Sequence, residues 1–141
     1  MTPETKEWAA KAEGDFSVAW AVYRMRKSRN DDAACFHCQQ CVEKYLKARL
    51  TEANTPFAKT HDCVGLLAMV LRFEPLWSGF EPACTRLNPF AVRFRYPGMN
   101  ATKEQAKQAL VDCGVMREAV RLSLDLPAAK QPKLARRRKS R

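Results

Sequence analysis

The sequence predicts an all-α protein that folds as an antiparallel, up-and-down bundle of four or five helices. Two observations carry this prediction. The chain of 141 residues has only five glycines and is rich in Ala, Leu, Glu, Lys and Arg, which favour helices. Long segments also repeat apolar residues every three or four positions, as amphipathic helices do, and short breaks with Pro, Asn or Gly separate them.

Two long helices are expected in the first half of the chain. Thr2 and Pro3 are typical of a helix start, and apolar residues then continue at helical spacing to about Lys27. The turn SRNDD follows, and a second helix is expected from about Asp32 to Thr51.

The second half of the chain is more interrupted. After a loop at 52–59, Thr60 is expected to cap a third helix. The region 80–95 contains two prolines, so we expect one kinked helix or two short ones there. A loop at 96–100 precedes a last helix, which is expected from about 102 to 126.

A basic segment follows the helical domain. Residues 1–126 are assigned to the bundle, and residues 127–141 hold seven cations and no acid. The whole chain has a net charge of +10, but the bundle carries 18 of the 25 basic side chains and all 15 acidic ones. A nearly balanced bundle lacks the basic stripe of a duplex-binding fold. We therefore expect a disordered, solubilising tail that can also contact RNA or another acidic surface.

The composition also bounds where the protein acts. No stretch approaches about 18 consecutive apolar residues, the length that spans a membrane. The N-terminus is acidic and polar, whereas a secretory signal peptide is basic and then apolar. We therefore expect a cytoplasmic protein without a membrane partner.

The stretch CFHCQQCVEKYLKARL, at 35–50, holds three cysteines three residues apart. On a helix, Cys38 and Cys41 fall on the central line of one wide apolar face, and Cys35 lies beside that line on the same face. This spacing superficially resembles iron–sulfur ligation, but such ligands lie on loops around the cluster, and the usual fourth ligand is missing. Zinc would need four converging ligands, and no second Cys/His pair follows. We expect structural cysteines, no metal and no cofactor.

A polar line runs along the same helix. His37, Gln40, Lys44 and Lys47 recur at helical spacing, with Glu43 beside them. This line can donate hydrogen bonds to phosphate, carboxylate or the carbonyl groups of a partner, or it can be a solvated face. It lacks a nucleophile–base pair, and Glu43 can pair with Lys47 four residues on.

Gln39 falls instead at the edge of the apolar face. Its amide is expected to be buried and to bond to the backbone near a helix break or the turn at 60–62. A buried amide of this kind would have a structural task.

These motifs resemble a known family. The pattern A-x-x-H-x-Q-Q-x-x-E-K-x-L-K-A at 34–48 is followed by K-T-H-D at 59–62 and by R-Y-P at 95–97. In a helical chain of this length, the three motifs in this order resemble the HEPN domain, over about residues 6–126.

The resemblance implies an up-and-down bundle similar to the substrate domain of kanamycin nucleotidyltransferase. It also implies a homodimer and a partnership with a minimal nucleotidyltransferase, frequently as a toxin–antitoxin pair. Many members of the family are metal-independent ribonucleases, whose signature is an Arg separated from a His by four to six residues, contributed by both subunits.

This chain departs from that signature. Neither His37 nor His61 has an Arg five to seven positions before it, and Asn100 stands five positions after Arg95. An Asn cannot transfer protons near neutral pH as an imidazole does. We therefore assign no catalytic residue.

The leading hypothesis is a non-catalytic interaction module that binds a nucleotidyltransferase partner, a nucleotide or RNA. The expected binding residues are His37, Gln40, Lys44, Lys47, His61, Arg95 and Tyr96. The alternative is an RNA-cleaving toxin with a non-standard set such as Arg95, His61 and Lys44. A third interpretation is a bundle that holds a small molecule for a partner enzyme.

Overall fold

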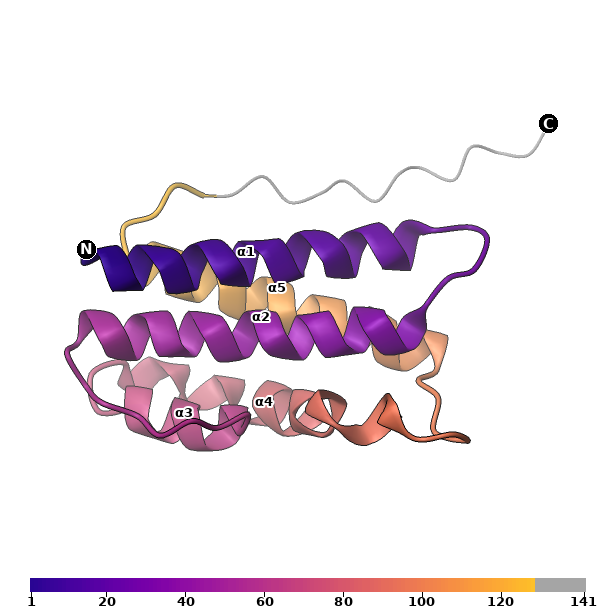
Figure 1. The fold of residues 1–141 in the computed structure, drawn as a ribbon. Helices are drawn as coiled ribbons and strands as arrows, with labels where there is room; N and C mark the ends of the chain where they lie inside the picture. Colours follow the sequence, from indigo (N-terminus) through magenta and orange to yellow (C-terminus); the bar gives the residue numbers. More distant parts are fainter. Residues whose placement is uncertain (129–141) are drawn as a thin grey trace.

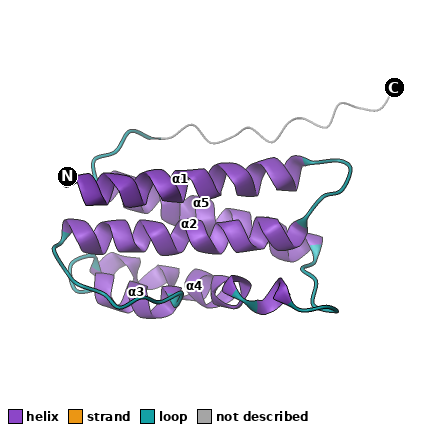
Figure 2. Ribbon diagram, viewed as in Figure 1, coloured by secondary structure: helices purple, strands orange, loops and turns teal. Residues whose placement is uncertain are grey.

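Three long helices form the body of the bundle in the computed structural model (Figure 1): α1 (Pro3–Arg24), α2 (Asp31–Glu52) and α5 (Lys103–Ser123). Two shorter helices, α3 (Cys63–Val70) and α4 (Glu81–Leu87), follow one another along the remaining side. Figure 2 shows helices and loops, and no strand, in the described part of the chain. The predicted all-α, up-and-down bundle is confirmed.

The central helix is α2, which packs against α1, α5 and α3. The side that contains α3 and α4 is completed by three short 3₁₀ helices, Pro75–Phe80, Asn88–Ala91 and Arg93–Arg95. Pro82 and Pro89 each stand near the start of a new helical piece, because a proline lacks the amide that would continue the previous one. The predicted interruption of the region 80–95 is therefore confirmed.

Side-chain caps fix where the long helices begin. Thr2 and Asn30 each accept a hydrogen bond from the backbone amide three residues on, at 3.1 and 2.9 Å. Thr102 and Gln105 form a reciprocal capping box at the start of α5. Each cap satisfies an amide that the first helical turn leaves without an intrahelical partner.

The start of α3 differs from the prediction. Asp62, and not Thr60, is the N-cap residue, and Thr60 Oγ1 instead accepts from the Asp62 amide at 3.0 Å in the turn before the helix. The first amide of α3, on Cys63, donates to Asn88 Oδ1 at 2.7 Å. The acceptor comes from a distant part of the chain, so the local sequence could not indicate it.

All six cysteines are buried and free, as the apolar face of the second helix predicts for those at 35, 38 and 41. Burial, with a smaller effect of Asp31 and Asp32, raises the pKa of Cys35 to about 12. The Cys35 thiol is therefore protonated at neutral pH and is not a nucleophile.

The structure describes residues 1–128. The tail expected to be disordered, 127–141, lies outside the described residues except for its first two positions. Within the described part of the chain, no helix combines the length and the apolar content needed to cross a membrane.

Candidate functional site

A buried carboxylate organises the middle of α2. The side chain of Glu43 is 3% exposed; its Oε1 lies 2.8 Å from His61 Nδ1, and its Oε2 accepts from Lys47 Nζ at 3.0 Å. Gln39 Nε2 donates to Glu43 Oε1 at 3.3 Å and to the His61 carbonyl oxygen at 2.9 Å. Gln40 Nε2 donates to Gln39 Oε1 at 2.6 Å. We call these five residues the Glu43 cluster.

Two predictions about α2 can be compared with this cluster. Gln39 is fully buried and bonds to the backbone of the turn at 60–62, as the sequence predicts. The side chain of Lys47, in contrast, is 8% exposed, and its Nζ lies 5.4 Å from the ring centre of Trp8 and 5.8 Å from that of Phe57. The expectation that Lys47 lies on an exposed line is wrong, because α1 and the loop before α3 cover it.

A second carboxylate joins α2 to α1. Asp15 Oδ1 lies 2.8 Å from His37 Nδ1, and Asp15 Oδ2 accepts from Lys44 Nζ at 2.5 Å. Burial alone would raise the pKa of Asp15, but the hydrogen bonds from His37 and Lys44 outweigh it and lower this pKa below its usual value. The carboxylate is therefore ionised at neutral pH. We call these three residues the Asp15 cluster.

The two carboxylates orient the two histidines. A carboxylate only accepts hydrogen bonds, so Nδ1 of His37 and of His61 carries the proton, and Nε2 is the acceptor when the ring is neutral. His61 is 63% exposed, and its Nε2 can face a ligand. In residues 1–128, however, neither ring bonds to a hydroxyl or thiol that could act as a nucleophile.

Arg95 and Tyr96 bond to neither cluster. They belong to the segment that precedes α5, at the end of the bundle where α1 connects to α2 (Figure 1). Arg95 helps to line a groove of about 390 Å³, together with Phe36, Phe90 and Phe94. Tyr96 is 69% exposed. The predicted binding residues therefore fall into two internal clusters and one surface segment.

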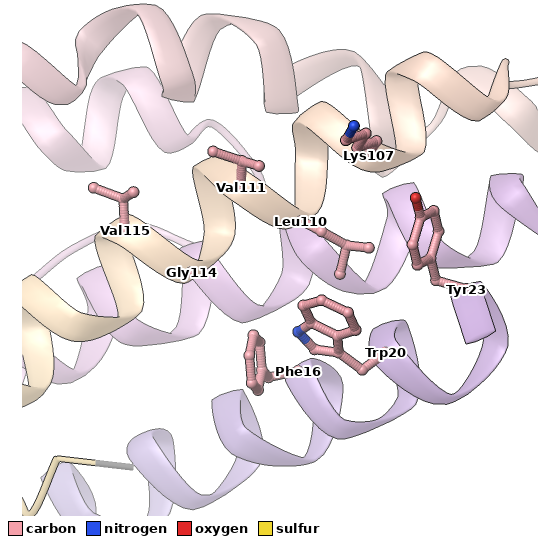
Figure 3. Close-up of a pocket in the computed structure, with 8 residues that line it drawn as sticks. All are labelled: Phe16, Trp20, Tyr23, Lys107, Leu110, Val111, Gly114 and Val115. Atoms are coloured by element: carbon pink, nitrogen blue, oxygen red, sulfur yellow. The ribbon is translucent and has the colours of Figure 1, made fainter. Parts of the chain in front are cut away.

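A second groove, of about 300 Å³, runs between α1 and α5 (Figure 3). It is lined from α1 by Phe16, Trp20 and Tyr23, and from α5 by Leu110, Val111 and Val115. Gly114 lies beside them, and a Cβ atom at that position would meet nothing within 4 Å. Within residues 1–128, no segment covers this apolar surface, which is typical of an interaction surface.

Asp15 is the residue of these clusters that sequence reasoning missed. It lies three residues after Ala12 and four before Ala19, both fully buried, so the helical period places it on the apolar face of α1. An acid on an apolar helix face needs a partner inside the fold. The position of Asp15 in the helical period is therefore a signal that the sequence alone contains. Glu13, two residues before Asp15 on α1, also has a partner within the fold: it accepts two hydrogen bonds from Arg117, both at 2.7 Å.

Within residues 1–128, the fold and the sites define a class of protein, a helical-bundle domain. The polar side chains in the middle of α2 bond to α1 and to the turn before α3, whereas unpaired cations and apolar grooves lie on the surface. Residues 5–123 match the sequence model of the HEPN domain, and the chain belongs to this family. The motifs at 34–48, 59–62 and 95–97 had indicated the same family.

One solved structure supports the fold independently. The chain is similar to TT1696 from Thermus thermophilus, with a TM-score of 0.73 and 19% sequence identity, over 86% of this chain and 98% of that one. At this identity the likeness shows the fold alone. No curated protein matches the chain.

Proposed function

We propose that this HEPN-domain chain is a non-catalytic interaction module. Its partner is a nucleotidyltransferase protein, or a phosphate-bearing ligand such as a nucleotide or RNA, in the setting of a toxin–antitoxin pair. One observation carries the proposal: Arg95 forms no side-chain hydrogen bond or ion pair within residues 1–128, although it lies beside an open groove.

The use of the other polar groups supports this choice. His37 and Lys44 are bonded to Asp15, and Lys47 is bonded to the buried Glu43, so these side chains stabilise the bundle. Arg95 remains free to grip two oxygens of a phosphate or carboxylate at once. Loops on a rigid scaffold are common places for such binding groups.

The experiment is copurification of the tagged chain from its native host, followed by identification of whatever binds. A nucleotidyltransferase chain or a nucleic acid is expected in the complex. The substitution Arg95→Ala with Tyr96→Ala should remove the partner, whereas Lys59→Ala, another exposed cation, should retain it. A partner that survives the double substitution would contradict the placement of the site.

The alternative, a ribonuclease with a non-standard site, is favoured by one observation. The exposed His61 has its Nδ1–H fixed by Glu43, as the ring of a general base is often fixed by a carboxylate. The test is incubation of the purified chain with end-labelled RNA in the presence of EDTA. Cleavage that is lost in His61→Ala would establish the enzyme and overturn the non-catalytic proposal.

A homodimer is also part of the proposal. The groove between α1 and α5 supplies an apolar face on two adjacent helices, and Val111 and Val115 stand exposed on it (Figure 3). A two-fold pairing would bring each copy of this face against the other.

A further inference from the structure

The positive charge of the bundle is concentrated at one end. The segments 23–33 and 92–107 meet there, where Asp32 Oδ1 accepts from the Ala101 amide at 2.6 Å (Figure 1). These segments hold eight of the 18 basic and three of the 15 acidic side chains of residues 1–126. The rest of residues 1–126 has ten basic and twelve acidic side chains. The whole excess of positive charge in the bundle therefore lies in these two segments. We call them the cationic end.

Cations elsewhere in the bundle mostly have internal partners, and those at the cationic end mostly do not. Arg49 pairs with Glu74 at 3.1 Å, and Arg86 pairs with Asp112 at 2.9 Å. At the cationic end, several side chains form no hydrogen bond or ion pair within residues 1–128: Arg26, Lys27, Arg93, Arg95, Lys103 and Lys107. Stability of the fold therefore does not explain their presence.

The local backbone presents two of these cations on a fixed support. Phe94 stacks on Phe90, with ring centres 5.4 Å apart, and the exposed Arg93 and Arg95 stand on either side of Phe94 in the chain. The segment enters α5 through a tight turn, which Gly98 permits with a φ of 84°. A site that is ordered before its partner arrives loses less entropy on binding.

We infer that the cationic end docks an acidic protein segment. The segment inserts one apolar side chain into the groove of about 390 Å³ beside Phe36, Phe90 and Phe94, and its carboxylates pair with Arg93 and Arg95. This inference rests on the proposed function, because it names the chemistry of the partner of that binding module.

Two observations favour a protein segment over a nucleic acid. The exposed residues among the cations include Met25, Val92, Tyr96 and Met99, and Arg, Tyr and Met are enriched at the centres of protein interfaces. The groove is also lined by Asp32, whose carboxylate would repel a phosphate placed inside the groove. A peptide can place an apolar side chain there and keep its acids at the arginines.

The experiment measures fluorescence anisotropy of labelled probes with the full chain. The first probe is a short Glu/Asp-rich peptide with one central Phe, the second is the same peptide with Ala in place of Phe, and the third is an oligouridylate. The test variant is Arg93→Glu with Arg95→Glu. The matched control is Lys6→Glu with Arg72→Glu, which changes the net charge equally at exposed positions away from the cationic end. Circular dichroism checks that both variants fold.

The Phe peptide is expected to bind the wild-type chain and to lose about tenfold or more in affinity in the test variant, with little change in the control. The Ala peptide should bind several-fold more weakly than the Phe peptide. Absence of peptide binding, or an equal loss in both variants, would overturn the inference. Tighter, Arg93- and Arg95-dependent binding of the oligouridylate would also overturn it, but would leave the binding module itself standing. RNA cleavage by the wild-type chain would instead count against the proposed function.

Discussion

Gln39 is a single residue on which two elements depend. Its amide donates to the His61 carbonyl and to Glu43, and accepts from Gln40, so it links α2 to the turn before α3. The substitution Gln39→Leu removes the donor to the His61 carbonyl oxygen and one of the hydrogen bonds to the buried Glu43, and it is expected to lower the free energy of unfolding by about 1–3 kcal/mol. Urea denaturation measures this change.

The neighbouring amide is the control for that substitution. Gln40 is only half-buried, and its amide can turn to water, so Gln40→Leu should cost less than Gln39→Leu. An unfolding free energy in Gln39→Leu equal to or above that of the wild type would show that its hydrogen bonds do not stabilise the fold.

Asp15 makes the stability of the bundle depend on pH. Burial raises the pKa of Asp15, but the hydrogen bonds from His37 and Lys44 together lower it by more. The pKa of Asp15 in the folded state therefore lies below its pKa in the unfolded chain. The stabilisation is therefore fully present at pH values above the pKa of Asp15 in the unfolded chain. It is lost as the pH falls through the pKa of Asp15 in the folded protein. Between about pH 5 and pH 2, the wild-type melting temperature should fall.

The variant Asp15→Asn is expected to melt at a lower temperature than the wild type at pH 7 and to show a shallower fall in acid. The fall should not vanish, because the pKa of Glu13 is also lowered, by Arg117 and Tyr45 against the effect of its burial. Asp125→Asn, at an exposed position after α5, should follow the wild-type curve. Parallel curves for the wild type and Asp15→Asn would contradict this assignment.

Elements whose signals are local were predicted well from the sequence, and elements that depend on distant partners were not. The start of α5 is set by Thr102 and Gln105, three residues apart, and a local pattern of this kind is visible in the sequence. The start of α3 depends on Asn88, which lies 25 residues after the amide it accepts from, and the sequence alone suggested Thr60 instead. Local capping chemistry can be read from a sequence, whereas a cap supplied across the fold cannot.

The same contrast gives a prediction for the helix starts. Thr102→Ala removes the acceptor for the Gln105 amide and is expected to destabilise the protein by about 1 kcal/mol. Amide hydrogen exchange should accelerate in the first turn of α5. Thr60→Ala loses only a bond to the Asp62 amide ahead of α3, so it should cost less. Equal costs for the two substitutions would argue against the capping box.

At the scale of the whole molecule, the sequence indicated which residues of α2 are polar but not what they contact. The helical period separates His37 and Lys44 from the apolar face, yet α1 brings Asp15 against them and the loop before α3 brings His61 against Glu43. The helical period of a sequence shows which residues share a face of one helix, but not which other elements pack against that face. Because α2 is packed on several sides, little of its polar surface is free. Arg95 lies on a surface segment that has fewer neighbours to satisfy its charge, and its role in binding stays a prediction.

The last prediction concerns the assembly of whole chains. If the apolar face of α1 and α5 pairs two copies, the protein should have a mass near twice 16.1 kDa by light scattering at micromolar concentrations. Val115→Asp places a charge on that face and should give the monomer mass, because an unpaired charge is costly to bury. Leu76→Asp, at a large apolar side chain that is 92% exposed and lies outside the groove, should leave the dimer intact. A wild-type monomer, or a dimer that survives Val115→Asp, would show that this groove serves a different partner.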